Sequence, residues 1–421
     1  MKKNDNREQL AWAILLACFA SWLVLIILVP LSVNNFIQNA RRELAISLQA
    51  NQGTVGLEEE GGQRQAIYVG EASRPVQAPS NIITNATDTA LLLVATANEE
   101  QLLARLQLYG NTTLKISQGV EPRYRWSTAN QTMKVMLPTG RVRITLPPNE
   151  GRPFHLTLET PQGLVTLDEA ALASIEVNNI STQVVVHSGR VSLQSLNNPT
   201  LISLTNDQRA EIPLDGFVLT FQSTERNLIK NGDFNQQLEN WSPLAWNVEL
   251  ADQPQGQVAM TAMANGPALT IARVGQGHAD VAVRQIINQD ITDFTTLQLE
   301  LGLRINNQSL EVCGSLGSEC PITVRMEYDD PNGNGQVWQQ GFYAIGTIGE
   351  NTPDICNSCP PPRPGHVQLP AGQFSFYQVN LLQEMAQQGL LPPSKITSLS
   401  LIAAGHSFAI DIFEIALIAQ E

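Results

Sequence analysis

The sequence of 421 residues is poor in basic side chains and lacks the motifs that mark common catalytic centres. Its 25 lysines and arginines are outnumbered by 39 acidic residues, and they stand singly or in pairs with no stripe that could follow a phosphate backbone. This distribution argues against nucleic acid as a partner. The sequence also contains no Gly-x-Ser-x-Gly turn, His-Glu-x-x-His motif, phosphate-binding loop or dinucleotide-binding fingerprint.

One enzymatic alternative stays open. The five histidines lie far apart in the sequence, so they offer no local cluster: His155, His187, His278, His366 and His406. A hydrolase can instead use two carboxylates, and the candidates are Asp233, Glu311, Glu327 and Asp411. Such an enzyme would act on a cell-wall polysaccharide and would need two of these groups in one groove.

One long segment lacks charge altogether. Residues 10–33, LAWAILLACFASWLVLIILVPLSV, are apolar, and no charged side chain occurs between Glu8 and Arg41. A helix of about 24 residues extends about 36 Å at 1.5 Å per residue, which is enough to cross a hydrocarbon core about 30 Å thick. The sequence therefore predicts a transmembrane helix over residues 10–33.

Two other interpretations of this segment fit less well. A cleaved signal peptide needs small residues at the end of its apolar core, and LVPLSVNNF provides a poor site. LLAC, which ends at Cys18, resembles a lipoprotein cleavage box, but the apolar run continues far beyond it.

Because the chain has few residues before the helix and most of its length after it, we expect a single-pass membrane protein. Residues 1–9, with Lys2 and Lys3, would be cytoplasmic and the body extracytoplasmic.

The pattern after the helix changes twice. Residues 34–64 contain a short helical pattern around Arg41–Gln49 and then the letters GLEEEGGQ, and they predict a stalk. Residues 65–225 consist of short alternating runs separated by Gly, Asn and Pro, which is typical of a β-sandwich. Thr139-Gly140 and Ser188-Gly189 separate alternating segments and predict two tight hairpins.

The letters PFHLTLETPQGLVTL, ASIEV and TQVVVHSGRVSLQS occur in order between Leu137 and Pro213. The last of them follows the pattern V-x-V-x-x-G-x-V at Val184–Val191. This segment resembles the extracytoplasmic domain of the FecR family. The resemblance implies a FecR-like β domain over residues 65–225, in a regulator that relays an outer signal to an anti-sigma segment or a sigma factor.

A different pattern occupies residues 226–421. NLIKNGDFN at 227–235 is followed by Trp241, and SFAIDIFEIAL covers 407–417. These segments resemble the first and last strands of galactose-binding-like jelly rolls, which include many carbohydrate-binding modules. The resemblance implies a second all-β domain in which the two strands pair and Trp241 is in the core. Between them, NLLQEMAQQG at 380–389 predicts one short helix.

Oxygen-bearing side chains offer two candidate sites for calcium. In the jelly rolls that the sequence resembles, a calcium ion often joins the first and last strands, and the matching residues are Asp233, Asn235 and Asp411. Plain strand contacts are the alternative, and no cofactor is required. DDPNGNG at 329–335 copies the start of an EF-hand loop, but Gly341 stands where the bidentate carboxylate is needed, so a hairpin turn is the better interpretation.

Aromatic residues are the candidates for sugar binding, because exposed rings stack on the apolar faces of pyranosides. The candidates in the second domain are Trp246, Trp338, Tyr343 and Tyr377. Burial of such rings contributes much stability, so membership of the core is the alternative for each of them.

Four cysteines lie outside the predicted membrane span: Cys313, Cys320, Cys356 and Cys359. An even number on an exported domain predicts two disulfides, with three connectivities open. A zinc site formed by the four thiolates, with His366 in reserve, is the alternative. A thioredoxin-like centre is not supported, because three prolines follow Cys359 and no helix can begin there.

Together these features predict an all-β protein, with two β-sandwich-type domains after one N-terminal transmembrane helix. We expect a membrane-anchored extracytoplasmic protein that has no catalytic activity and binds a glycan or an envelope protein. A FecR-like regulator that relays an envelope signal across the membrane is the alternative, and a polysaccharide-acting enzyme comes third.

Overall fold

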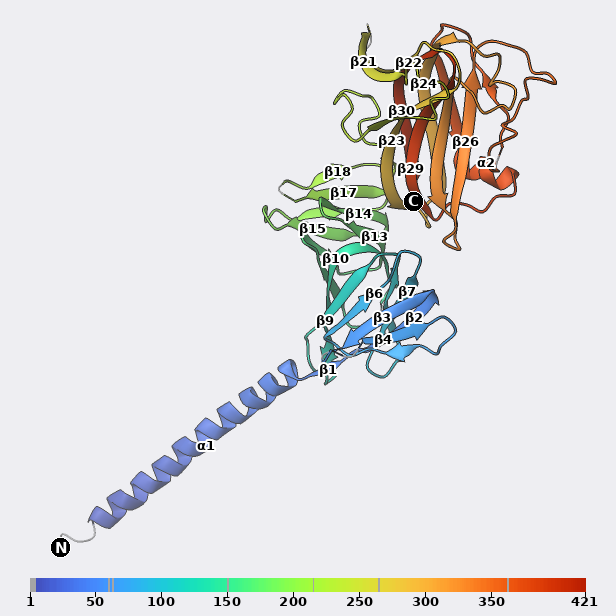
Figure 1. The fold of residues 1–421 in the computed structure, drawn as a ribbon. Coiled ribbons are helices and arrows are strands. Elements are labelled where there is room, and N and C mark those ends of the chain that lie inside the picture. The colour runs from blue at the N-terminus through green and yellow to red at the C-terminus, as the bar shows by residue number, and fades with distance from the viewer. Residues whose placement is uncertain are drawn as a thin grey trace. The chain divides into compact units, whose positions relative to one another are not determined.

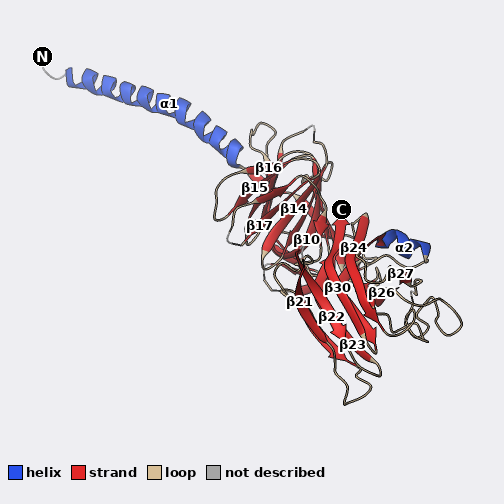
Figure 2. Ribbon diagram, turned by 90° about the horizontal axis from the view of Figure 1, so that it is seen from above, coloured by secondary structure: helices blue, strands red, loops and turns tan. Residues whose placement is uncertain are grey.

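The computed structural model describes residues 5–59, 61–62, 64–149, 151–214, 216–263, 266–361 and 363–421. The chain divides into two compact units, Met1–Ser223 and Thr224–Glu421 (Figure 1). Strands dominate both units, and the sheets are arranged as sandwiches (Figure 2). The predicted fold class, two all-β domains with one N-terminal apolar helix, is confirmed.

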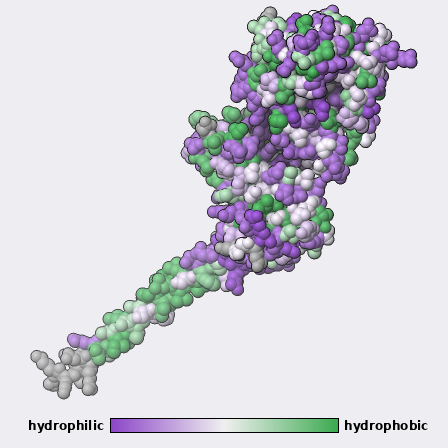
Figure 3. All heavy atoms as spheres, viewed as in Figure 1, coloured by the Kyte–Doolittle hydropathy of each residue, from purple (hydrophilic) through white to green (hydrophobic). Residues whose placement is uncertain are grey.

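Helix α1 (Asp5–Asn39) contains the predicted span. Its segment Gln9–Asn39 is long and apolar enough to cross a membrane, and none of its most apolar part is buried. Figure 3 shows the apolar surface along this helix, which gives way to polar surface at its C-terminal end. By length and composition α1 is therefore a candidate membrane span. Residues 1–4 of the expected cytoplasmic tail, including Lys2 and Lys3, lie outside the described residues.

Strands, and not a stalk, follow α1. We expected a helical stretch around Arg41–Gln49 within a stalk at 34–64, but β1 (Arg41–Glu43) begins two residues after the helix ends. The next strand, β2 (Ala45–Gln52), pairs along its length with β7 (Thr89–Ala95), and its alternate residues are buried in the first core. The prediction was wrong because a partner strand 37 to 50 residues away determines the conformation of this segment.

The first unit contains two sheets that share one long strand and enclose one hydrophobic core. Sheet A consists of β1, β3 (Thr54–Glu59), β4 (Arg64–Tyr68), β6 (Ser80–Ile83), β9 (Thr113–Pro122), β10 (Gln131–Leu146), β11 (Phe154–Glu159), β12 (Gly163–Leu167), β15 (Val191–Ser195) and β16 (Ile202–Leu204). Sheet B consists of β2, β5 (Arg74–Pro75), β7, β8 (Leu102–Leu108), the second half of β10, β13 (Ala171–Val177), β14 (Ser181–Ser188), β17 (Gln208–Pro213) and β18 (Leu219–Phe221).

Strand β10 crosses between the two sheets where we predicted a hairpin. Its first half pairs with β9 and β11, and its second half pairs with β8 and β13. The crossing lies at Gly140, where φ is +103° and a Cβ would lie 2.4 Å from the Cα of Thr112. The glycine therefore serves a sheet crossing and not a turn. Ser188-Gly189 likewise joins β14 in sheet B to β15 in sheet A, so the second hairpin prediction was also wrong.

The second unit is a sandwich of two six-stranded sheets around its own core. Sheet C consists of β19 (Arg226–Asn227), β21 (Gln257–Met263), β22 (Gly266–Arg273), β24 (Thr296–Gln308), β28 (Ser375–Asn380) and β30 (Phe408–Gln420). Sheet D has the order β20 (Ser242–Trp246), β23 (Ala279–Asp290), β29 (Lys395–Gly405), β25 (Ile322–Asp329), β26 (Gly335–Tyr343) and β27 (Val367–Gln368).

Three predictions for this unit are confirmed. The first and last strands pair, with Arg226 opposite Ala419 in β19 and β30. Trp241 is buried, and its indole nitrogen donates to the carbonyl oxygen of Asn231 at 3.1 Å. The predicted helix is α2 (Leu381–Gln387), whose N-terminus is capped by the side chain of Asn380.

Candidate functional site

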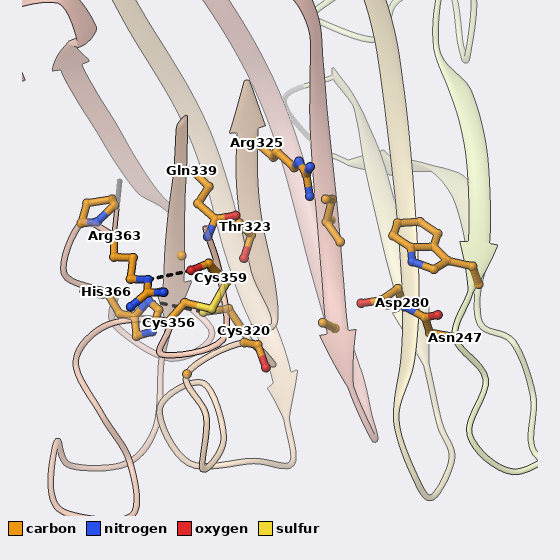
Figure 4. Close-up of a pocket in the computed structure, with 17 residues that line it drawn as sticks. Asn247, Asp280, Cys320, Thr323, Arg325, Gln339, Cys356, Cys359, Arg363 and His366 are labelled. Carbon is orange, nitrogen blue, oxygen red and sulfur yellow. Dashed lines mark hydrogen bonds between the residues drawn. A yellow bond between two sulfur atoms is a disulfide. The ribbon is translucent and has the colours of Figure 1, made fainter. Parts of the chain in front are cut away.

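The candidate site is a cleft on the outer face of sheet D, which is the face turned away from the core. Strands β20, β23, β29, β25 and β26 supply its floor, and Cys356, Cys359, Arg363 and His366 form one wall (Figure 4). The cleft encloses about 230 Å³. It is lined by Trp246, Asn247, Asp280, Gly317, Ser318, Cys320, Thr323, Arg325, Gln339, Gly341, Cys356, Cys359, Arg363, Pro364, His366, Ile402 and Ala404.

The alternation of β25 explains why polar side chains reach the cleft. Ile322, Val324, Met326 and Tyr328 are buried in the core. Successive side chains of a strand point to opposite faces, so Thr323, Arg325 and Glu327 lie on the outer face. Sheet D therefore carries an apolar inner face and a polar outer one.

Arg325 lies at the centre of the polar row. In the register of the sheet it stands between Gln339 of β26 and Ser400 of β29. Its Nε is buried and makes no hydrogen bond to any described residue. The Nη2 atom of Arg325 lies 3.6 Å from Glu327 Oε1, and Oε2 of the same carboxylate lies 2.5 Å from an Arg284 nitrogen and 2.9 Å from the Ser398 hydroxyl. Because a guanidinium carries five N–H donors, this one long ion pair leaves Arg325 with donor capacity for a ligand.

A hydrogen-bonded acidic group, Asp280 of β23, also lines the cleft; it stands opposite Ala404 of β29, whereas Arg325 stands opposite Ser400 of the same strand. The Oδ2 atom of Asp280 accepts from the Asn247 side chain at 2.7 Å and lies 3.2 Å from His278 Nε2. His278 Nδ1 lies 2.9 Å from Glu319 Oε1. Burial alone would lower the pKa of His278, but the hydrogen bonds and charges of Glu319 and Asp280 outweigh it and raise that pKa.

Two disulfides stabilise the wall of the cleft. Cys313 pairs with Cys320 and Cys356 pairs with Cys359, so of the three open connectivities the structure has the local one. The sulfurs of Cys313 and Cys320 and a ring nitrogen of His366 lie within 4.8 Å of one another. Among the described residues, these three form the one cluster that could hold a metal ion. Because these sulfurs are bonded to each other, the structure has disulfides in place of the zinc alternative.

Close packing brings this wall against the sheet. His366 Nδ1 lies 3.6 Å from Cys320 Sγ, and burial lowers the pKa of His366. Gly341 of β26 lies below both groups. A Cβ at this position would lie 2.4 Å from Cys320 Sγ and 2.7 Å from His366 Nδ1, so only glycine lets the wall approach so closely.

Of the four predicted sugar-binding aromatics, only Trp246 lines the cleft, where 37% of its surface is exposed. Trp338 and Tyr343 are buried, at 0% and 3% exposure, so the structure contradicts a ligand-facing role for them. Trp338 points to the core, and the segment around Cys313 and Cys320 covers Tyr343. Tyr377 of β28 packs edge-on against Phe342 at 4.8 Å, and this burial raises its pKa.

Asp411, one of the residues predicted to hold calcium, is bonded to other side chains in the structure. Both oxygens of Asp411 accept hydrogen bonds from other side chains: Oδ1 from Thr270, and Oδ2 from Arg304 and Asn306, each at 2.7 Å. Burial would raise the pKa of Asp411, but these bonds outweigh it and lower that pKa. In the structure Asp411 is thus the partner of an arginine and of two neutral donors.

The other two predicted ligands lie in the groove that Arg304 also lines. Asp233 bonds locally to Asn235 at 2.6 Å, and both line this groove on sheet C with Arg304 and Phe413. The expected hairpin at 329–335 is present between β25 and β26. There Asp330 accepts from the backbone nitrogens of Asn332 and Asn334, as a turn residue does, and these bonds lower its pKa.

Sequence reasoning found Trp246 but missed the polar groups beside it. Arg325 and Gln339 are on the consecutive strands β25 and β26, but Asp280 is in β23, and only the order of sheet D places all three strands in one cleft floor. A usable signal was present in β25, whose letters ITVRMEYD alternate strictly and place Arg325 on the side opposite the core.

No protein-family model matches the sequence, and no curated protein sequence matches it. Among solved structures, a putative anti-sigma factor from Parabacteroides distasonis is similar at 15% identity over 40% of this chain and 67% of its own, with a TM-score of 0.25. A family 11 carbohydrate-binding module from Clostridium thermocellum, solved with a mixed-linked tetrasaccharide, is similar at 13% identity over 46% and 94%, with a TM-score of 0.27. Since both TM-scores are below 0.5, neither likeness decides the function.

Proposed function

We propose that this protein is a membrane-anchored extracytoplasmic binding protein whose second domain binds a glycan in the cleft of sheet D. It has no catalytic activity of its own in this proposal. Helix α1 would remain in the chain as a single-pass anchor, with residues 1–9 in the cytoplasm. The observation that carries the proposal is the lining of the cleft, which combines the guanidinium of Arg325 and the amide of Gln339, opposite each other in the sheet, with the ring of Trp246.

The chemistry of the cleft suits a polyhydroxylated ligand. Sugar hydroxyls both donate and accept hydrogen bonds, and the cleft offers a guanidinium donor at Arg325, an amide at Gln339 and a carboxylate at Asp280. The side-chain amide of Gln339 makes no hydrogen bond within the described part of the chain. The indole face of Trp246 supplies apolar surface against which a pyranoside ring can stack. A few placed polar groups beside one aromatic ring is the usual composition of a small-ligand site.

The test is binding of the full chain, held in detergent, to a glycan array, followed by calorimetry on the strongest ligand. We expect Trp246→Ala and Arg325→Ala each to weaken binding at least tenfold. Trp126→Ala is the matched control, because Trp126 is an exposed tryptophan of the first domain, at 81% exposure. Binding to no glycan would overturn the proposal and leave an envelope protein as the ligand. If Trp246→Ala and Trp126→Ala weaken glycan binding equally, the cleft is not the binding site.

A regulatory role is the second candidate. The observation in its favour is the direct junction between α1 and the first domain: β1 begins two residues after the helix, and the backbone nitrogen of Arg123 donates to the carbonyl oxygen of Ala40 at 3.0 Å. A rigid junction can transmit movement of the domain to the helix. Insertion of a glycine-serine linker after Ala40 should abolish such a response, and an unchanged transcript profile would count against this role.

A further inference from the structure

We infer that the loop Arg123–Thr128, together with Arg41, is a second membrane contact, which lies on anionic lipid head groups beside the outer end of α1. This inference rests on the proposed function only in taking α1 as a membrane anchor. It adds a named surface of the first domain and a partner of stated chemistry, a phospholipid surface with negative charge.

Hydrogen bonds fix this loop to the last turn of α1. The side-chain oxygen of Gln38 accepts from the backbone nitrogen of Thr128 at 2.8 Å and from its hydroxyl at 3.1 Å. The hydroxyl of Ser127 donates to the carbonyl oxygen of Gln38 at 3.3 Å. The rings of Phe36 and Tyr124 lie 6.0 Å apart. The loop therefore has a fixed height along the helix axis.

Arg152 holds the loop from its other side. Its guanidinium donates to the carbonyl oxygens of Ser127 and Ala129, both at 2.5 Å, and to that of Arg125 at 3.2 Å. These bonds satisfy the backbone of the loop from within the domain. As a result the side chains of Arg125 and Trp126 are free to face solvent, and both are exposed.

The height of the loop matches the head-group layer. The apolar run of α1 ends at Val33, and Gln38 lies five residues beyond it, or about 7.5 Å along the axis. The polar layer on each side of a bilayer is about 5–8 Å thick. Trp126, which is 81% exposed, thus lies at the depth where tryptophan is enriched in membrane proteins.

Charge selects the partner. The whole chain carries a net charge of -14, yet this surface collects Arg41, Arg123 and Arg125, all exposed. None of the three forms an ion pair with a described residue, whereas the neighbouring Arg42 is paired with Glu121 at 2.6 Å. Arg41 donates one hydrogen bond to the carbonyl oxygen of Gln38 at 2.6 Å, which fixes it beside the loop. Arginines without an acidic partner beside an exposed tryptophan fit lipid phosphates, to which a guanidinium can bind with two hydrogen bonds.

The test places a fluorophore on the loop of the full chain. In a Cys18→Ser background the other four cysteines are in disulfides, so Trp126→Cys provides the one thiol for an environment-sensitive dye. The chain is reconstituted in phosphatidylcholine vesicles with or without phosphatidylglycerol, some carrying a nitroxide on the lipid head group. Phe217→Cys, at a position 73% exposed in the same domain, is the matched control.

We expect the head-group nitroxide to quench the dye at position 126 at least threefold more than at position 217. Phosphatidylglycerol should increase the quenching at position 126, and the double variant Arg123→Gln, Arg125→Gln should reduce this increase. Vesicle flotation reports the anchor separately. If the protein floats and the two dyes are quenched equally, the inference is overturned while the anchor stands. If the protein does not float, the anchor of the proposed function fails and the inference fails with it.

Discussion

His278 lies between two carboxylates and joins strand β23 to the disulfide loop: its Nδ1 is 2.9 Å from Glu319 Oε1, and its Nε2 is 3.2 Å from Asp280 Oδ2. Glu319 belongs to the loop closed by Cys313 and Cys320, next to the wall of the cleft. The protonated imidazole can donate to both carboxylates at once, whereas the neutral ring can donate to only one. The attachment of this loop to the sheet therefore depends on pH.

We predict that the second domain loses stability as pH rises through the pKa of His278. That pKa is raised in the folded state, so the stabilisation is fully present below the unfolded value of 6.5 and is lost above the folded value. His278→Gln should remove this part of the pH dependence. The wild type should therefore have the larger free energy of unfolding at acidic pH, and the two proteins should be equally stable at alkaline pH. His406→Gln is the control.

Urea unfolding followed by tryptophan fluorescence measures this effect in the right domain, because Trp241 and Trp338 are both buried in the second unit. Curves for wild type and His278→Gln that stay parallel from pH 5 to pH 9 would contradict the prediction.

A second prediction concerns the ion pair of Arg304 and Asp411, whose atoms lie 2.7 Å apart. Asp411 is almost fully buried and Arg304 is partly exposed, so Asp411→Asn leaves a charge without its partner. We expect the free energy of unfolding to fall by about 1–3 kcal/mol, less than for a fully buried pair. Because the pKa of Asp411 is lowered, this stabilisation is present above the unfolded value of 3.8 and is lost as pH falls through the folded value.

Asp233→Asn is the matched control for this pair, because Asp233 is exposed and bonds only to the nearby Asn235 among the described residues. Calcium provides a further check. If calcium raises the unfolding midpoint of the wild type but not of Asp411→Asn, Asp411 binds the ion in solution and the arginine pairing gives way to it.

The sequence was informative where the pattern is local. The uncharged run of α1, the turn at Asp330 and the helix after Asn380 each depend on residues within a short window, and each was predicted. The pairing of β19 with β30 joins distant residues, but it came from a resemblance to a family and not from the residues alone.

The predictions were wrong or incomplete where segments distant in the sequence determine the conformation or the burial of a residue. Gly140 was taken for a hairpin turn, because a glycine between two alternating runs has the same letters whether the chain turns back or crosses to another sheet. The sequence leaves open whether Tyr343 is a ligand-facing or a core ring, because its cover comes from a loop around Cys313. The floor of the cleft was missed for the same reason: β29 joins the strands of Asp280 and Arg325 into one sheet, and it lies more than 60 residues beyond both in the sequence.

A third prediction concerns the two disulfides. Without reduction, only Cys18 should react with a thiol reagent after denaturation, and mass spectrometry should show four more reactive thiols after reduction. Replacing both Cys313 and Cys320 by alanine should lower the stability of the second domain by about 2–3 kcal/mol, the loop-closure value for a bridge of this span. Cys18→Ser should leave it unchanged. Five reactive thiols in the unreduced chain, with bound zinc, would instead establish the metal site.

The last prediction separates the shape of the cleft from its chemistry. Gly341 and Gly335 are both in β26, but a Cβ at 341 would lie 2.4 Å from Cys320 Sγ, whereas nothing lies within 4 Å of a Cβ at 335. Gly341→Ala must therefore displace the wall that carries His366 and Cys320, at a cost of about 1–3 kcal/mol for overpacking. Gly335→Ala should change stability by less than about 1 kcal/mol.

Because the displaced wall borders the cleft, Gly341→Ala should also weaken binding of the glycan found on the array, by more than tenfold in calorimetry. Every polar group of the floor, including Arg325 and Gln339, is intact in this variant. A ligand that binds Gly341→Ala and Gly335→Ala equally well would touch only the floor near Trp246, and the wall around His366 would then have no part in recognition.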